Sequence, residues 1–98
     1  MKKTDTDLSV IKLKDQISEL YDAIVSIDDI KECSLFFDDL CTYKEIEQMA
    51  QRVTAARLLL EGYTYEEVIK KTKISSATLS RVSKCIKLGK GYNKVLKK

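Results

Sequence analysis

The chain of 98 residues is long enough for a single domain with one modest core, since chains of this size bury only about 60–70% of the surface that they expose when unfolded. It contains no proline and three glycines, and its longest apolar runs fall far short of the roughly 20 residues that span a bilayer, which predicts an all-α, soluble, cytoplasmic protein. The net charge is +3. The absence of histidine excludes a His-containing zinc site and gives catalysis little support. The three cysteines, Cys33, Cys41 and Cys85, are expected to be reduced packing residues.

Two amphipathic helices are predicted in the first 41 residues. The segment from Leu8 to about Ile27 places apolar side chains at helical spacing, with acidic side chains opposite them, and residues 1–7 before it are expected to fray. Asp28 is expected to cap a second helix with a broad apolar stripe, formed by Ile30, Cys33, Phe36, Phe37, Leu40 and Cys41. So wide a stripe needs more than one neighbouring element to cover it.

A third helix is predicted from Tyr43 to Glu61. Thr42 and Glu45 form a T-x-x-E capping box at its start, and Gly62 suits its C-terminal cap. Its apolar side chains go most of the way round the helix by its end, and a chain of this size has too few neighbours to cover them. We therefore expect a second copy of the chain to supply the rest, which predicts a homodimer.

Two short helices and a tight turn follow, an arrangement typical of a helix-turn-helix at residues 64–87. Thr64 and Glu67 form a second capping box for a helix through about Thr72, and Ser75 or Ser76 caps a fifth helix through about Leu88. After two glycines, Tyr92 to Leu96 is expected to form one last turn or short helix. The inward contacts of the motif are expected from Val68, Ile69, Ile74, Leu79, Val82 and Ile86.

The outward face of the fifth helix carries small, hydroxyl and basic side chains, namely Ser76, Ala77, Ser80, Arg81, Ser83, Lys84 and Lys87. Small residues allow close entry into the major groove, hydroxyls bond phosphates or base edges, and cations neutralise phosphates. The turn contains no glycine, so Lys73 or a neighbour must adopt the positive φ that such a turn needs.

Charge is divided unevenly along the chain. Residues 1–69 carry 8 basic and 15 acidic side chains, whereas residues 70–98 carry 10 basic side chains and no acidic one. Such a division indicates a polyanionic partner at the C-terminal third, and with the helix-turn-helix it favours double-stranded DNA over a solvated basic tail.

The sequence also resembles a known family. The segment AQRVTAARLLLEGYTYEEVIKKTKISSATLSRVSK, above all QRVTAARLLLEG and ATLSR, is similar to the Trp repressor superfamily and within it to the YerC/YecD group of Trp-repressor-like proteins. The resemblance covers nearly the whole chain. It implies six helices in a single domain, an intertwined dimer and repression of transcription.

Positions that contact DNA in that family can be carried over to this chain. The resemblance places base reading on Ser76, Ala77 and Ser80, with Thr78 at a phosphate. Basic side chains in and after the fifth helix are expected to add sequence-independent phosphate contacts, from Arg81, Lys84, Lys87, Lys90 and Lys94.

The resemblance also implies a candidate effector pocket. Two arginines that sandwich the indole of tryptophan in the Trp repressor align with Arg52 and Arg81, and a serine that helps hold the ligand aligns with Cys85. The glycine of the repressor is Val82 here, and a β-branched side chain at that position fills space near the ligand. A tryptophan corepressor is therefore disfavoured, and ligand-independent binding is preferred over another small effector. For Arg81 a phosphate contact is the preferred role.

The sequence thus predicts a sequence-specific, DNA-binding transcriptional regulator that acts as a dimeric repressor, with no enzymatic activity, no cofactor, no metal and no membrane partner. The alternative is a dimeric helical protein-interaction module whose basic C-terminal third docks an acidic protein partner.

Overall fold

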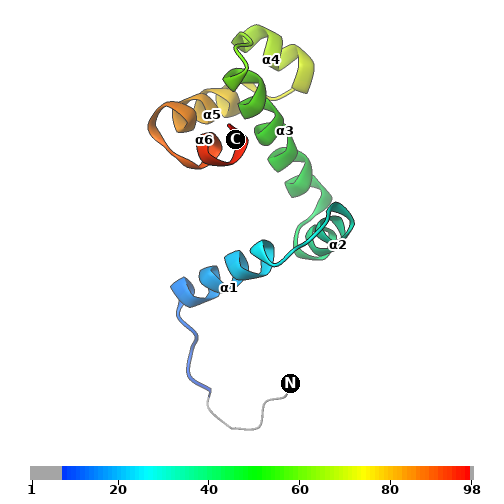
Figure 1. Cartoon of the computed structure of the whole chain (residues 1–98), viewed down its shortest axis with the longest axis vertical. Coiled ribbons are helices and arrows are strands. Elements are labelled where there is room, and N and C mark those ends of the chain that lie inside the picture. The colour runs from blue at the N-terminus through cyan, green and yellow to red at the C-terminus, as the bar shows by residue number, and fades with distance from the viewer. Residues whose placement is uncertain (1–7, 98) are drawn as a thin grey trace. The chain divides into compact units, whose positions relative to one another are not determined.

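Figure 1 shows the computed structural model of the chain, which describes residues 8–97. Within that range the chain forms six α-helices and no strand, which confirms the all-α prediction: α1 (Leu13–Val25), α2 (Ile30–Leu40), α3 (Tyr43–Leu60), α4 (Tyr65–Thr72), α5 (Ser76–Leu88) and α6 (Gly91–Leu96). None of these six is long and apolar enough to cross a membrane. The chain divides into two compact units, the first extending to Phe37 and the second beginning at Asp38, and the predicted fraying of residues 1–7 lies outside the described residues.

α1 is shorter than the sequence predicted at both ends. Its N-cap residue, Lys12, has extended backbone and provides no side-chain cap, and the preceding Val10 and Ile11 are β-branched residues with modest helix propensity. The side chain of Gln16 donates a hydrogen bond to the carbonyl oxygen of Ile11 at 3.0 Å. The apolar spacing therefore extends beyond both ends of the helix that forms.

The cap of α2 is Asp29 rather than Asp28, so the predicted cap is wrong by one residue. The backbone N–H of Glu32 donates to the Asp29 carboxylate at 2.8 Å, and the backbone N–H of Asp28 donates to the Glu32 carboxylate at 2.9 Å. Asp28 thus contributes its backbone instead of its side chain, and the pair acts as a capping box with a return bond displaced by one residue.

Neither α1 nor α2 buries a side chain, counting the part of the chain that the structure describes. Apolar side chains on both helices are exposed, among them Tyr21 and Val25 on α1 and Ile30 and Leu35 on α2. The rings of Phe36 and Phe37 meet edge to face, with centroids 5.9 Å apart, but both remain only half-buried. Their apolar faces therefore still need a covering surface.

The predicted start of α3 is confirmed, and its end at Leu60 lies one residue before the predicted one. The Glu45 N–H donates to the Thr42 hydroxyl at 3.1 Å, and the Thr42 N–H donates to the Glu45 carboxylate at 2.8 Å. At the other end Gly62 has a φ of 98°, and the N–H of Tyr63 donates to the carbonyl oxygen of Leu58 at 3.1 Å. This is a Schellman cap, in which glycine avoids the steric cost of the left-handed conformation.

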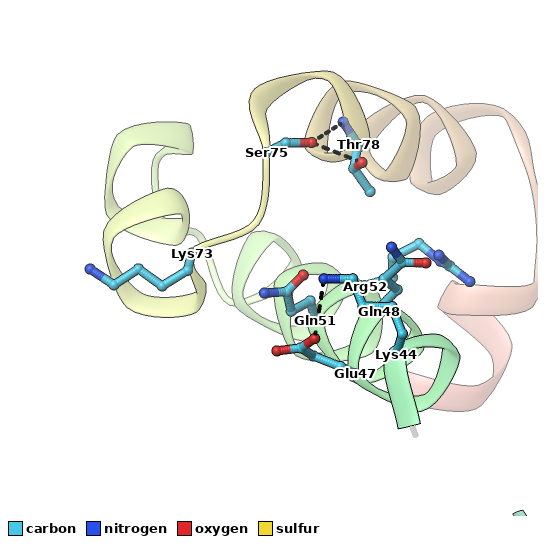
Figure 2. Close-up of a pocket in the computed structure, with 8 residues that line it drawn as sticks. All are labelled: Lys44, Glu47, Gln48, Gln51, Arg52, Lys73, Ser75 and Thr78. Atoms are coloured by element: carbon cyan, nitrogen blue, oxygen red, sulfur yellow. Dashed lines mark hydrogen bonds and ion pairs between the residues drawn. The ribbon is translucent and has the colours of Figure 1, made fainter. Parts of the chain in front are cut away.

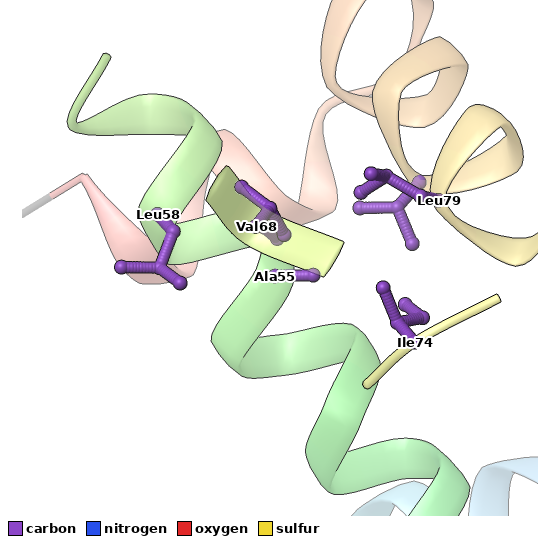
Figure 3. Packing of buried hydrophobic residues seen from close by; sticks show 7 residues of the cluster. Ala55, Leu58, Val68, Ile74 and Leu79 are labelled. Atoms are coloured by element: carbon purple, nitrogen blue, oxygen red, sulfur yellow. The ribbon is translucent and has the colours of Figure 1, made fainter. Parts of the chain in front are cut away.

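α4, α5 and α6 surround the C-terminal half of α3, and the buried core lies among them (Figures 1 and 3). α3 contributes small side chains beside one larger one, whereas the helix-turn-helix contributes larger apolar ones; the buried apolar residues are Ala55, Ala56, Leu58, Val68, Ile74, Leu79 and Val82. Ile69 and Ile86 pack against this cluster and are half-buried. The six inward contacts predicted for the motif are therefore confirmed.

Ser83 is the exception on α5. It was expected on the outward face, but its residue is only 7% exposed and lies on the core side of the helix. The outward expectation was wrong because a helix of 13 residues packed on α3 keeps a narrower solvent face than its polar side chains suggest. Serine tolerates this position because it is small.

Candidate nucleic-acid interface

The first helix of the motif, α4, begins at a confirmed capping box. The Glu67 N–H donates to the Thr64 hydroxyl at 3.2 Å, and the Thr64 N–H donates to the Glu67 carboxylate at 2.8 Å. α4 is joined to α3 by one longer hydrogen bond, in which the Gln51 side chain donates to the carbonyl oxygen of Thr72 at 3.2 Å. Both ends of this eight-residue helix are therefore tied down.

The turn between α4 and α5 depends on Lys73, which has a left-handed backbone with φ 65° and ψ 16°. This confirms that a residue other than glycine adopts the positive φ. The Lys73 N–H donates to the carbonyl oxygen of Ile69 at 2.8 Å. The Thr72 hydroxyl donates to the carbonyl oxygen of Val68 at 2.7 Å and accepts from the Ile74 N–H at 3.2 Å. Ile74, which is 2% exposed, then anchors the turn in the core.

Ser75 is the N-cap of α5, which decides between the two predicted caps. Its hydroxyl accepts from the Thr78 N–H at 3.2 Å and donates to the Thr78 hydroxyl oxygen at 2.9 Å (Figure 2). The Thr78 hydroxyl keeps its own proton for another acceptor. Thr78 is half-buried, on the side of α5 that faces α3.

The exposed face of α5 presents the predicted DNA contacts together: Ser76, Ala77, Ser80, Arg81, Lys84 and Lys87. The ion pairs between described residues are Lys44–Glu47, within α3, and Arg57–Glu61, between α3 and its C-cap residue, so none involves Arg81, Lys84 or Lys87. Lys90 lies apart from this face, at the N-cap of α6, where it is exposed and lines an apolar groove.

A polar cleft of about 380 Å³ separates the first half of α3 from the turn and the start of α5. Lys44, Gln48 and Arg52 follow one another at intervals of four residues on α3, and Ser75 and Thr78 lie across the cleft from them (Figure 2). The side chain of Lys73 points away from this group in the same view. Donor groups of α3 therefore face the start of the predicted reading helix.

The three residues of the predicted effector pocket meet at one cavity of about 420 Å³. Arg52 comes from α3 and Arg81 and Cys85 from α5, with Thr78, Val82 and Tyr92 completing the wall. Val82 is only 1% exposed and belongs to the core cluster, so it packs between helices while its surface closes one side of the cavity.

Three residues near the motif and the arginine cavity, namely Tyr92, Lys70 and Lys71, were not among the predicted site residues. Tyr92 on α6 lines the cavity. No local sequence pattern predicted this contact, because it depends on how α6 folds back. Lys70 and Lys71 form the basic last turn of α4, beside the turn of the motif. The acid-free C-terminal third was a signal for these two lysines, since it begins at residue 70.

Comparisons with known proteins agree with this geometry. The Trp repressor protein family model matches residues 15–98. The chain is 46% identical over 74 residues to the uncharacterized protein YerC of Bacillus subtilis (strain 168). The aligned residues cover 76% of this chain and 71% of that protein.

Two solved structures have the same fold as this chain. A Staphylococcus aureus protein assigned provisionally to the Trp repressors has a TM-score of 0.82 and 38% identity, covering 85% of this chain and 84% of its own. A TrpR-like protein of Eubacterium eligens ATCC 27750 has a TM-score of 0.81 and 38% identity, covering 85% and 87%. With its six helices, its helix-turn-helix and these relatives, the chain belongs to the Trp repressor family, in the YerC-like group.

Proposed function

We propose that the protein is a cytoplasmic transcriptional regulator that binds double-stranded DNA through α4 and α5 and represses as a homodimer. The observation that carries this proposal is the exposed face of α5, where small, hydroxyl and basic side chains stand together with no acidic residue between positions 70 and 98. A polyanion fits this face, and the major groove admits a helix of these dimensions.

Base reading falls on the first turns of α5. Ser76 and Ser80 lie one turn apart and present hydroxyl groups, and Ala77 beside them allows close approach and apolar contact with a thymine methyl group. Thr78 stands on the flank of the helix with a hydroxyl proton available for a phosphate oxygen.

Sequence-independent affinity comes from the cations that follow. Arg81, Lys84 and Lys87 are exposed and take no part in the ion pairs of the described residues, so they are available to neutralise phosphates. Lys90, in the loop after α5, is expected to reach a phosphate of the DNA backbone.

A dimer accounts for the exposed apolar faces of the first two helices. α1 and α2 bury no side chain among the residues that the structure describes, yet each carries a continuous apolar stripe. Pairing two chains through these stripes removes the stripes from water. A symmetric dimer then presents two copies of α5 to major grooves about 34–36 Å apart.

DNA binding is proposed to be independent of tryptophan and to need no cofactor. Val82 closes one side of the cavity between Arg52 and Arg81, and the Cys85 thiol is a weak hydrogen-bonding partner for an amino group. Arg81, which is exposed, is better placed to meet a phosphate than to enclose a ligand.

A gel-shift assay on random duplex DNA at low and high salt tests the proposal, followed by selection of bound fragments from genomic DNA. We expect retention at low salt, its loss at high salt, and a roughly palindromic selected site. The absence of retention at either salt would contradict DNA binding and support an interaction module with an acidic protein partner.

Sedimentation equilibrium tests the dimer. Ile17 lies within the apolar stripe of α1, so Ile17→Asp places a charge in the proposed interface and is expected to yield monomers. Glu19→Ala on the polar side of the same helix is the control and is expected to remain dimeric. A monomeric wild-type protein at micromolar concentration would refute the dimer.

A further inference from the structure

Tyr92 occupies an unusual position on the short helix α6. α6 contacts both α3 and α5, and Tyr92 and Leu96, one turn apart, are its half-buried apolar side chains that pack on the core cluster. The helix is fastened to α5 by the Asn93 side chain, which donates to the carbonyl oxygen of Ile86 at 2.8 Å. The residue after Tyr92 therefore holds the start of α6 next to α5 through a polar contact.

The turn that returns α6 to α5 requires glycine at position 89. A Cβ atom at Gly89 would lie 2.7 Å from the carbonyl oxygen of Cys85, closer than side-chain carbons approach backbone oxygens. The Gly89 N–H donates to that same oxygen at 2.8 Å. This close approach brings Tyr92 back alongside the last turns of α5.

Tyr92 lines two cavities beside α5. One is the cavity of about 420 Å³ that Arg52, Thr78 and Arg81 line. The other is an apolar groove of about 560 Å³ between α3 and α6, which Val53, Val95 and Leu96 line. Cys85 and Tyr92 are the two residues common to both walls, and of these only tyrosine has the bulk of an aromatic ring.

We propose that Tyr92 is a positioning residue for DNA reading. Its ring packs between α5 and α3 and holds the reading helix in place without a bound ligand. This inference rests on the proposed function and adds to it the means by which α5 is oriented. The cavity wall that Tyr92 forms also includes Thr78 and Arg81, two proposed phosphate contacts, so movement of the ring displaces groups that meet DNA.

Removal of the ring has a specific consequence. Tyr92→Ala takes away an aromatic side chain from both walls and leaves a space of the shape of a phenol beside α5. The group removed is itself a phenol, so phenol from solution can occupy this space and make the same aromatic contacts. The variant is therefore expected to gain a binding site for phenol, and phenol is expected to restore the support that α5 has lost.

The test compares affinities for a duplex selected by the wild-type protein and for a random duplex, with and without millimolar phenol. We expect Tyr92→Ala to lose about tenfold in affinity for the selected duplex, the cost of one poorly read base pair, with a much smaller loss on random DNA. Phenol should return most of this loss. Tyr92→Phe keeps the ring and should match the wild-type protein.

Leu96→Ala is the matched control, because Leu96 is on the same helix and packs on the same core but does not line the arginine cavity. It is expected to lower the melting temperature without any rescue by phenol. Equal affinity of Tyr92→Ala and the wild-type protein for the selected duplex, or a loss that phenol does not change, overturns the proposal.

Two further outcomes are separable. If Tyr92→Ala does not fold, Tyr92→Leu replaces it, since leucine keeps apolar bulk without a flat ring; wild-type affinity of this variant overturns the proposal, and a loss confined to the selected duplex supports it. If the wild-type protein itself binds no duplex, the proposed function fails. Calorimetry of phenol binding to Tyr92→Ala then still decides whether the ring fills the space beside α5.

Discussion

The contribution of Lys84 and Lys87 to DNA binding can be predicted as a change in salt dependence. Both side chains are exposed on α5, and neither takes part in an ion pair among the described residues. Each phosphate contact contributes about 0.9 to the slope of log affinity against log salt concentration. Two lysines in each subunit of a dimer give roughly four contacts, so the double variant Lys84→Ala/Lys87→Ala is expected to lower the slope by about 3.6.

This difference is large enough to measure directly. Between about 50 and about 200 mM salt, the wild-type protein should lose about a hundredfold more affinity than the double variant. Alanine is favourable in helices, but Lys87 lies in the last turn of α5, so its removal is expected to cost about 0.3–1 kcal/mol through the helix dipole. Thermal unfolding is therefore measured alongside DNA binding.

Fluorescence anisotropy of a labelled random duplex over a series of salt concentrations gives the slope. Lys31→Ala on the polar side of α2 is the matched control, since it removes the same charge from an exposed position on a helix outside the helix-turn-helix, and its slope should equal that of the wild-type protein. An unchanged slope for the double variant would refute the assignment of these lysines to phosphates, whatever the absolute affinities.

Three further predictions concern stability. Leu79→Ala removes a fully buried side chain and is expected to cost about 2–5 kcal/mol in urea unfolding, while Leu88→Ala, 76% exposed, should change stability by less than about 0.5 kcal/mol; similar costs for the two would contradict the core. Gly89→Ala should destabilise by about 1–3 kcal/mol because its Cβ meets a carbonyl oxygen at 2.7 Å, whereas Gly91→Ala meets nothing within 4 Å and should be neutral or stabilising in a thermal melt. Lys73→Gly relieves a left-handed lysine and is expected to raise stability by up to about 1 kcal/mol; a lower melting temperature would show that the lysine side chain outweighs its backbone strain.

Local capping signals made the middle of this fold predictable from sequence. The boundaries of α3, α4 and α5 follow from Thr42, Gly62, Thr64 and Ser75, whose side chains or backbone act on neighbours within a few residues. The positive φ in the turn could be placed only at Lys73 or a neighbour, because the turn contains no glycine, and the structure shows that Lys73 adopts it.

Where no local signal existed, prediction failed or was silent. The ends of α1 could not be placed from apolar spacing alone, since no side chain caps its first turn. The burial of Ser83 depends on how closely α5 packs on α3, and the contact of Tyr92 with the arginine cavity depends on the return of α6 past Gly89. Both are tertiary facts that no short window of sequence contains.

The exposed apolar stripes of α1 and α2 have a consequence for the amount of protein that a cell must hold. Helices of 13 and 11 residues without tertiary support are marginal in water, so their order must draw on association with another surface. In a dimer that support follows mass action, whereas the core around Leu79 forms within one chain at any dilution. The copy number of the protein would then set how completely α1 and α2 are folded, and through dimerisation how many reading helices reach DNA as pairs.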